Sequence, residues 1–261
     1  MKNSDEGSYS ESGIFQILMS PHAYLHRKVS PNEPVSELRK IKIIECGEPL
    51  VDFLEMCPEI LWAKPVWNYT REHLLRLSVA ERLCKAARNL PKGYRLAVVE
   101  GWRPLHIQRR MHLSAYLRWK ERHPDWSPAQ LKRFTNRFTA PIDKKVPPPH
   151  TTGGAVDVRL CDENGNELDM ISPYKTGEPR AYPFDAKNLS KEARKNRRIL
   201  KEVMESAGIT NYPSEYWHYS YGDQGWAYRG GHPYAIYGLI EPPGYKPPQG
   251  EDVDEPLEFV R

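Results

Sequence analysis

Two long stretches of the chain repeat apolar residues at three- and four-residue steps, which is the spacing of the buried face of a helix. The first stretch covers residues 74–90 and is followed by a Pro-Lys-Gly turn. The second covers residues 193–207 and is followed by a glycine, so both have a helix-ending signal. Two further helices are predicted over residues 104–120 and 129–138, where a proline suits the first turn. The pattern therefore predicts four main helices.

Shorter segments have the pattern of strands. Residues 94–100 are apolar enough to lie inside a sheet, and residues 155–160 and 217–221 alternate large apolar and other side chains. An Asn-Gly turn after the second of these strands predicts that residues 167–171 return as a hairpin partner. Helices and strands are thus both expected to build the fold.

The composition fits a soluble globular protein with many ordered loops. The 261 residues are 39% hydrophobic and 28% charged, with 24 prolines, and this length suits one sizeable core or two small ones. Residues 1–46 are polar and punctuated by proline, so we expect an arm that is partly disordered at its start. The segment from residue 244 onward is rich in proline and acidic residues and is expected to be a peripheral tail.

Charge and cysteine usage exclude several classes of protein. A net charge of +4 is small for this length, and the basic residues within 191–201 are mixed with glutamates, so neither favours a nucleic-acid binder. The N-terminal segment lacks the pattern of a signal peptide, and no run of ~18 apolar residues is present, so we expect a cytoplasmic protein without a membrane span. The four cysteines show no Cys-x-x-Cys spacing and fit reduced thiols.

Candidate chemistry begins in residues 147–160, where a proline run, a Gly-Gly turn and the alternating strand follow one another. In that strand the large apolar residues share one face, and Asp157 lies on the other. If the glycine turn folds His150 back over this polar face, an imidazole and a carboxylate meet, as a metal site or a catalytic pair requires. The alternative is that His150 is a loop residue and Asp157 a solvated strand residue.

A second strand offers a matching pair. His218 lies opposite the aromatic face of residues 217–221, and Glu215 must lie in the loop or bulge that leads in. Pairing the two strands would gather His150, Asp157 and His218 around one point. Two imidazoles and one carboxylate leave the fourth tetrahedral position of a zinc ion open for water, and Glu215 could accept the proton of that water.

Arg103 completes this set at the junction between a predicted strand and a predicted helix. Its guanidinium suits a developing oxyanion or a substrate carboxylate. Structural alternatives are that Arg103 forms a salt bridge with Glu100 and that His218 is a core histidine. No His-Glu-x-x-His and no Gly-x-Ser-x-Gly motif is present, so neither the common zinc-protease motif nor a serine hydrolase competes with this site.

Three motifs in this order resemble those of the D-alanyl-D-alanine dipeptidase family, the zinc D,D-dipeptidases of the vancomycin-resistance type. They are Glu100-Gly-Trp-Arg103-Pro104, His150-x6-Asp157 with Gly-Gly-Ala-Val between, and Glu215-Tyr-Trp-His218. The similarity extends over most of the chain, to about Pro243. The resemblance implies an α+β fold, a compact single domain with a central antiparallel sheet flanked by helices. It also implies one zinc ion (Zn2+) per chain and hydrolysis of D-Ala-D-Ala, a small dipeptide substrate.

The resemblance further implies a role for each matching residue and a division of the chain. The roles are His150, Asp157 and His218 as metal ligands, Glu215 as general base and Arg103 as the arginine that stabilises the transition state. The expected division is an N-terminal arm at 1–46, a zinc dipeptidase domain at 47–243 and a C-terminal tail at 244–261. No partner besides the dipeptide is expected, neither nucleic acid nor membrane.

Two departures from the family's pattern concern the choice of substrate. Pro148 stands where the family often has a serine, and Glu100 replaces the more usual aspartate three residues before the arginine. Two alternatives therefore stay open, a D,D-carboxypeptidase acting on peptidoglycan stem peptides and a non-catalytic zinc module that binds cell-wall ligands. The presence of Glu215 and Arg103 beside three ligands favours an enzyme, because a structural zinc site is normally closed by four protein ligands.

Overall fold

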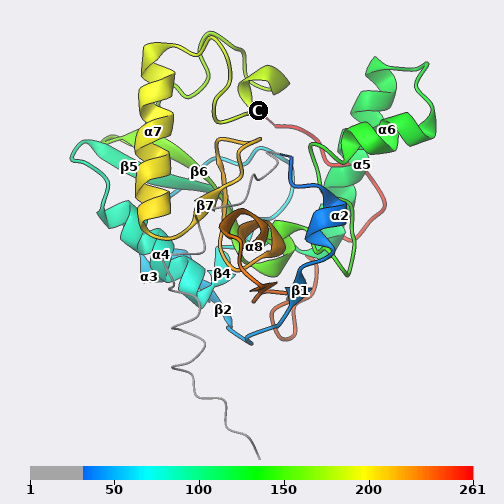
Figure 1. Cartoon of the computed structure of the whole chain (residues 1–261), viewed down its shortest axis with the longest axis horizontal. Coiled ribbons are helices and arrows are strands. Elements are labelled where there is room, and N and C mark those ends of the chain that lie inside the picture. Colours follow the sequence, from blue (N-terminus) through cyan, green and yellow to red (C-terminus); the bar gives the residue numbers. More distant parts are fainter. Residues whose placement is uncertain (1–31, 261) are drawn as a thin grey trace, which may run out of the picture.

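The centre of the fold is a five-stranded sheet with the strand order β3-β5-β6-β8-β7. Its strands β5, β6 and β7 are labelled in Figure 1. The computed structural model describes residues 32–260. The bounds of these strands are β3 Leu61–Trp62, β5 Tyr94–Glu100, β6 Ala155–Asp162, β7 Thr210–Asn211 and β8 His218–Ser220. The predicted strands at 94–100 and 155–160 are confirmed, as is the α+β class.

The sheet is mixed, so the expectation of a central antiparallel sheet needs a correction at one edge. β5, β6, β8 and β7 pair antiparallel, but β3 runs parallel to β5. The connection from β3 to β5 contains β4, Leu74–Arg76, and α4, Leu77–Arg88. Such a long crossover returns the chain to the end of the sheet where it started, and the next strand then runs in the same direction.

One face of the sheet carries the main core. Val156, Val158 and Leu160 of β6 are fully buried in it, as the alternation predicts. Residues of α4 and of α7, Lys191–Ser206, belong to the same core, and the two helices lie together on one side of the molecule in Figure 1. Each such buried apolar side chain contributes about 1.5–3 kcal/mol relative to exposure. This packing holds β6 in an orientation that places the side chain of Asp157 on the opposite face of the sheet.

The remaining elements surround this sheet. Helix α5, Leu105–Arg122, leads to α6, Pro128–Thr135, and the two project from the body of the molecule in Figure 1. Ser127 and Gln130 form a capping box at the start of α6. The other elements are α2 Val35–Leu38, α3 Phe53–Met56, α8 Gln224–Gly230, the 3-10 turns η2 Pro149–Thr152 and η3 Pro179–Ala181, and two small sheets that pair β1 Lys42–Ile43 with β9 Tyr234–Ala235 and β2 Leu50–Asp52 with β4.

Two local predictions were wrong. Residues 74–76, expected at the start of a helix, form β4, because their backbone pairs with β2. Residues 167–171 do not return as a full strand, although Glu167 bridges to Cys161 of β6 and the Leu168 N–H donates to the Leu160 carbonyl oxygen at 2.9 Å. The side chain of Asp169 accepts hydrogen bonds from the backbone N–H of Ile171 and Ser172, which turns the chain away from the sheet.

The two ends of the described chain pack against the body. Residues 35–38 contact α8, whereas the disorder expected for the start of the arm falls outside the described residues. Residues 251–257 lie along α5, where Arg110 donates hydrogen bonds to the carbonyls of Glu251 and Glu255, and Leu257 is buried. The proposed division into arm, domain and tail stays a prediction.

Two further expectations can be compared with the described part of the chain. No helix within residues 32–260 has the length and apolar character needed to cross a bilayer. The four cysteines are all unpaired, and three of them are buried. They fit the prediction of reduced thiols.

Candidate metal centre

The turn that carries His150 depends on two glycines. Gly153 ends η2 with a φ of 69°, and a Cβ atom there would lie 2.5 Å from the side chain of Leu50. At Gly154 a Cβ atom would lie 2.7 Å from the carbonyl oxygen of Tyr221, at the end of β8. The glycine pair thus lets the chain fold His150 back over β6 and lets the β8 segment approach.

The register between β6 and β8 brings the second histidine to the same place. Asp157 pairs directly with His218 across the two antiparallel strands. The N–H of Val158 also donates to the carbonyl oxygen of Trp217 at 3.0 Å, which fixes the register one residue further along. Side chains at paired positions of antiparallel strands lie on one face and close together. The pairing of the two strands predicted from the sequence is confirmed.

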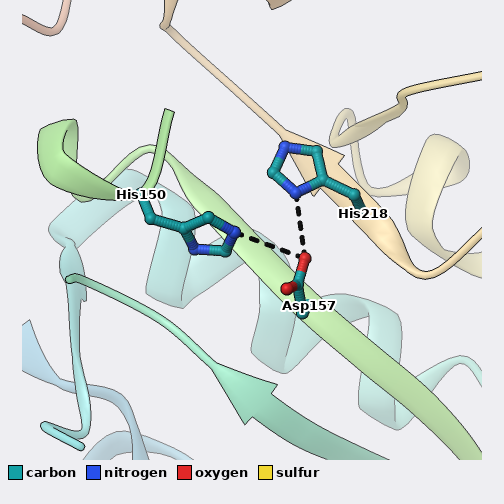
Figure 2. A group of neighbouring side chains, drawn as sticks. All are labelled: His150, Asp157 and His218. Carbon is teal, nitrogen blue, oxygen red and sulfur yellow. Dashed lines mark hydrogen bonds and ion pairs between the residues drawn. The ribbon is translucent and has the colours of Figure 1, made fainter. Parts of the chain in front are cut away.

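Three side chains converge on this polar face (Figure 2). His150 Nε2 lies 3.3 Å from Asp157 Oδ1, and His218 Nδ1 lies 2.9 Å from the same oxygen. The two imidazole rings have centroids 4.9 Å apart and an interplanar angle of 73°. One ligand atom from each residue lies within 4.8 Å of the others, and both histidines are buried. The arrangement could hold a metal ion.

The hydrogen bonding of His150 fits a cation. Its Nδ1 lies 2.8 Å from the carbonyl oxygen of Gly101, which can only accept, so Nδ1 carries a proton. In a neutral ring Nε2 then presents a lone pair toward the Asp157 carboxylate, and a cation between these two acceptors satisfies both. A histidine that ligates a metal commonly donates its other N–H to a backbone carbonyl in this way.

The charge on Asp157 supports the same conclusion. Burial alone would raise the pKa of its carboxyl group, but His150 and His218 beside it hold that pKa far below its usual range. The carboxylate therefore stays ionised on a face of the sheet that is largely shielded from water. A buried anion of this kind needs a positive partner, which is the protonated histidines themselves or, when both rings are neutral, a bound cation.

Glu215 lies next to this cluster without belonging to it. It is part of the turn after Tyr212, whose carbonyl oxygen accepts the Glu215 N–H, and it lies in the loop that leads into β8, as expected. Burial raises the pKa of its carboxyl group to about 8, the charge on Asp157 adds to this, and Arg103 opposes it. The charges of Asp157 and Arg103 thus shift the pKa of Glu215, and Glu215 is not one of the three residues that could hold the metal.

Arg103 is buried at the end of β5 and holds a bidentate ion pair with Glu100. Its Nε and Nη2 donate to the two carboxylate oxygens of Glu100 at 2.6 Å each, and its Nη1 donates to Gln108 Oε1 at 2.7 Å. The salt bridge considered as an alternative is therefore present. Arg103 is also tied to the turn that carries His150, because its backbone N–H donates to the carbonyl oxygen of His150 at 3.1 Å.

Comparison with known proteins identifies the relatives of this chain. A sequence model described as D-ala-D-ala dipeptidase matches residues 64–235, more than half of the chain. The chain belongs to this family. A D-alanyl-D-alanine dipeptidase of Synechocystis sp. is 29% identical over 250 residues, covering 82% of this chain and 100% of its own length. Dipeptidases of the same name from Enterococcus faecalis and Enterococcus faecium are 28% and 26% identical, covering 51% and 62% of this chain and 64% and 80% of their own lengths.

Membership of the D-Ala-D-Ala dipeptidase family supports a peptidase function, and the matched segment contains all five candidate residues. The structure places the three candidate ligands together, with Glu215 and Arg103 on separate flanking elements. Pro148 begins the His150 turn, and its carbonyl oxygen accepts hydrogen bonds from the N–H and the hydroxyl of Thr151.

Several residues that shape the site were not singled out from the sequence. Asn211 of β7 donates from its side-chain amide to the carbonyl oxygens of Glu215 and His218, at 3.0 Å each, and so holds the loop between them. Tyr69 and Gln108 contact the Glu100–Arg103 pair. Tyr69 is distant in sequence from Glu100, whereas Gln108 and Asn211 are near their partners in sequence but lie on other elements. No hydrophobic periodicity marks any of the three.

Proposed function

We propose that this member of the D-Ala-D-Ala dipeptidase family is a zinc-dependent enzyme that hydrolyses D-alanyl-D-alanine. His150, Asp157 and His218 would hold the zinc ion, Glu215 would act as general base, and Arg103 would stabilise the transition state. The observation that carries the proposal is the convergence of two buried imidazoles and an ionised carboxylate, with a second carboxylate beside them. Two imidazole ligands with one carboxylate are a known set for catalytic zinc.

The chain's own residues supply the proton transfers. A zinc ion bound at the three ligands would supply a Lewis acid that makes water nucleophilic near neutral pH. Burial and the Asp157 charge raise the pKa of Glu215 to about 8, and a cation held at the three ligands would favour the carboxylate form. The Glu215 carboxylate then accepts the proton of the attacking water and donates it to the amine that leaves.

Arg103 supplies fixed positive charge. Three of its five N–H groups donate to Glu100 and Gln108, and the Tyr69 hydroxyl also lies beside the guanidinium, so at least one N–H group remains for another partner within the described part of the chain. Because its neighbours already hold the guanidinium, no rearrangement is needed when negative charge develops on the substrate carbonyl oxygen.

The test combines metal content with D-alanine release. The purified protein is expected to contain one zinc per chain and to release D-alanine from D-Ala-D-Ala, with little release from L-Ala-L-Ala. Glu215→Gln should lower kcat at least about a hundredfold, because general-base catalysis contributes on the order of 10²–10⁴. Its zinc content should stay unchanged. Glu205→Gln, on the exposed side of α7, is the matched control and should keep full activity.

Three results would change this conclusion. A protein without stoichiometric zinc, or a fully active Glu215→Gln variant, overturns the mechanism. Faster cleavage of a peptidoglycan stem pentapeptide than of the dipeptide assigns the site to a D,D-carboxypeptidase. Dipeptide binding without turnover assigns it to a non-catalytic zinc module.

A further inference from the structure

A buried tyrosine contacts the ion pair that holds Arg103. The hydroxyl group of Tyr69 donates to Oε1 of Glu100, the same oxygen that accepts from Arg103 Nε. Tyr69, Glu100 and Arg103 are all buried. Burial raises the pKa of the Tyr69 hydroxyl well above its ordinary value, and the charge on Glu100 adds to this, so the group stays protonated and donates.

We infer that Tyr69 is a positioning residue for Arg103, acting through Glu100. The inference rests on the role proposed for Arg103 and adds a residue that is not among the ligands, the base or the arginine. The Tyr69 hydroxyl fixes the orientation of the Glu100 carboxylate, and that carboxylate fixes the plane of the guanidinium.

The position of Glu100 shows why its carboxylate needs fixing. A bulge in β5 between Val98 and Glu100 places Glu100 opposite Asp157 in the sheet. A free carboxylate here could turn toward a cation at the ligand cluster and compete with Asp157. The hydrogen bonds from Tyr69 and Arg103 occupy both of its oxygens and hold it on the arginine.

The backbone around Tyr69 is held in turn by the C-terminal segment. The N–H and the hydroxyl of Thr70 donate to Glu251 Oε1 at 2.8 and 2.7 Å. On the other side of Tyr69, Asn68 exchanges hydrogen bonds with Glu258, since its N–H donates to the Glu258 carbonyl at 3.0 Å and its side-chain oxygen accepts the Glu258 N–H at 2.6 Å. These bonds fix the tyrosine from both sides.

The packing of the ring allows the hydroxyl to be tested alone. The Tyr69 ring lies in a small apolar cluster with Ile107, Met111 and Leu257. Phenylalanine keeps this packing and removes only the donor. Tyr237→Phe is the matched control, because the Tyr237 hydroxyl likewise donates to a glutamate, Glu48 Oε2 at 2.7 Å, and its ring is fully buried.

The experiment measures kcat, KM and zinc content of the holoenzyme with D-Ala-D-Ala. Tyr69→Phe is expected to lower kcat about tenfold, the size of one charge-assisted hydrogen bond, with KM within about twofold and zinc unchanged. Tyr237→Phe should leave kcat within about twofold of the parent. Glu251→Ala, which frees Thr70 without altering the tyrosine, should lower kcat by a smaller factor and serves if Tyr69→Phe does not fold.

A double-mutant cycle tests whether Tyr69 acts through Glu100. Glu100→Asp shortens the side chain and withdraws the carboxylate from the hydroxyl. In that background Tyr69→Phe should change kcat less than about twofold, because the contact is already lost. An equal loss in both backgrounds, or an unchanged kcat in Tyr69→Phe itself, overturns the inference.

A signal that does not depend on activity separates this inference from the proposed function. The NMR resonance of Arg103 Nε–H, assigned by its absence in Arg103→Lys, should shift in Tyr69→Phe and stay in place in Tyr237→Phe. If the parent protein does not cleave D-Ala-D-Ala, the proposed function is wrong but the inference about Tyr69 is not affected. If the Arg103 resonance does not shift in Tyr69→Phe, the inference is wrong even when the enzyme is active.

Discussion

The ligand half of the candidate site and its arginine half are held by different parts of the chain. His150, Asp157 and His218 lie on one turn and two paired strands, and the core behind β6 fixes the position of Asp157. Arg103 is held by side chains, Glu100, Gln108 and, through Glu100, Tyr69. Backbone hydrogen bonds therefore place the ligands, whereas a network of side chains places the arginine.

This difference predicts how each half responds to change. Replacing one ligand removes one of the three atoms that would hold the metal, because each residue of the cluster offers one ligand atom. The arginine half contains several linked contacts, so the loss of one contact loosens the guanidinium without removing its charge. We expect all-or-none effects in the ligand half and graded effects in the arginine half.

The largest effect is expected for Asp157→Asn. The amide keeps the shape of the side chain and removes the negative charge between the two histidines, so zinc should be lost and activity should fall at least about a thousandfold. Zinc content by mass spectrometry and D-alanine release measure both quantities. Asp162→Asn, at the other end of β6, is the control and should keep its zinc, because Asp162 serves the turn at residues 164–166. A zinc-replete Asp157→Asn variant contradicts the ligand assignment.

A smaller effect is expected for Arg103→Lys. Lysine keeps the charge but cannot make the bidentate pair with Glu100 or present the same donors, so kcat should fall about a hundredfold. Zinc content should not change, because the ligands lie on other elements. Arg82→Lys, on α4, loses a comparable guanidinium bond, to the carbonyl oxygen of Ala207, and should keep its activity. Loss of zinc in Arg103→Lys would show that the two halves are not separate.

The same comparison explains how far the sequence could predict the site. The alternation in residues 155–160 fixes which side of β6 faces the core, and the Gly-Gly turn and the second strand then bring His150 and His218 to Asp157. Each of these steps depends on local periodicity or turn chemistry, which a single sequence displays. The α+β class and the main helices follow for the same reason.

The rest depends on contacts between distant segments. Tyr69 contacts Glu100 from a loop 31 residues earlier in the chain, and Glu251 and Glu258 bond to the residues on either side of the tyrosine. The parallel pairing of β3 with β5 likewise depends on the path of a long connection. No periodicity marks such partners. The C-terminal segment was expected to be peripheral, but it contacts the loop of Tyr69, a residue that the sequence did not indicate.

The smallest effect on activity is expected for Leu257→Ala. Leu257 is buried in the cluster with Tyr69, Ile107 and Met111, so truncating it leaves a cavity and should lower the free energy of unfolding by about 2–3 kcal/mol. Because the hydrogen bonds at Asn68 and Thr70 remain, kcat should fall less than about threefold. Thermal unfolding and steady-state kinetics measure the two quantities, and Leu239→Ala, at a partly exposed leucine, is the control. Leu257→Ala could instead lower kcat as much as Tyr69→Phe does. Packing of the C-terminal segment would then position Arg103 as strongly as the Tyr69 hydroxyl does, which contradicts the expected order of effects in the arginine half.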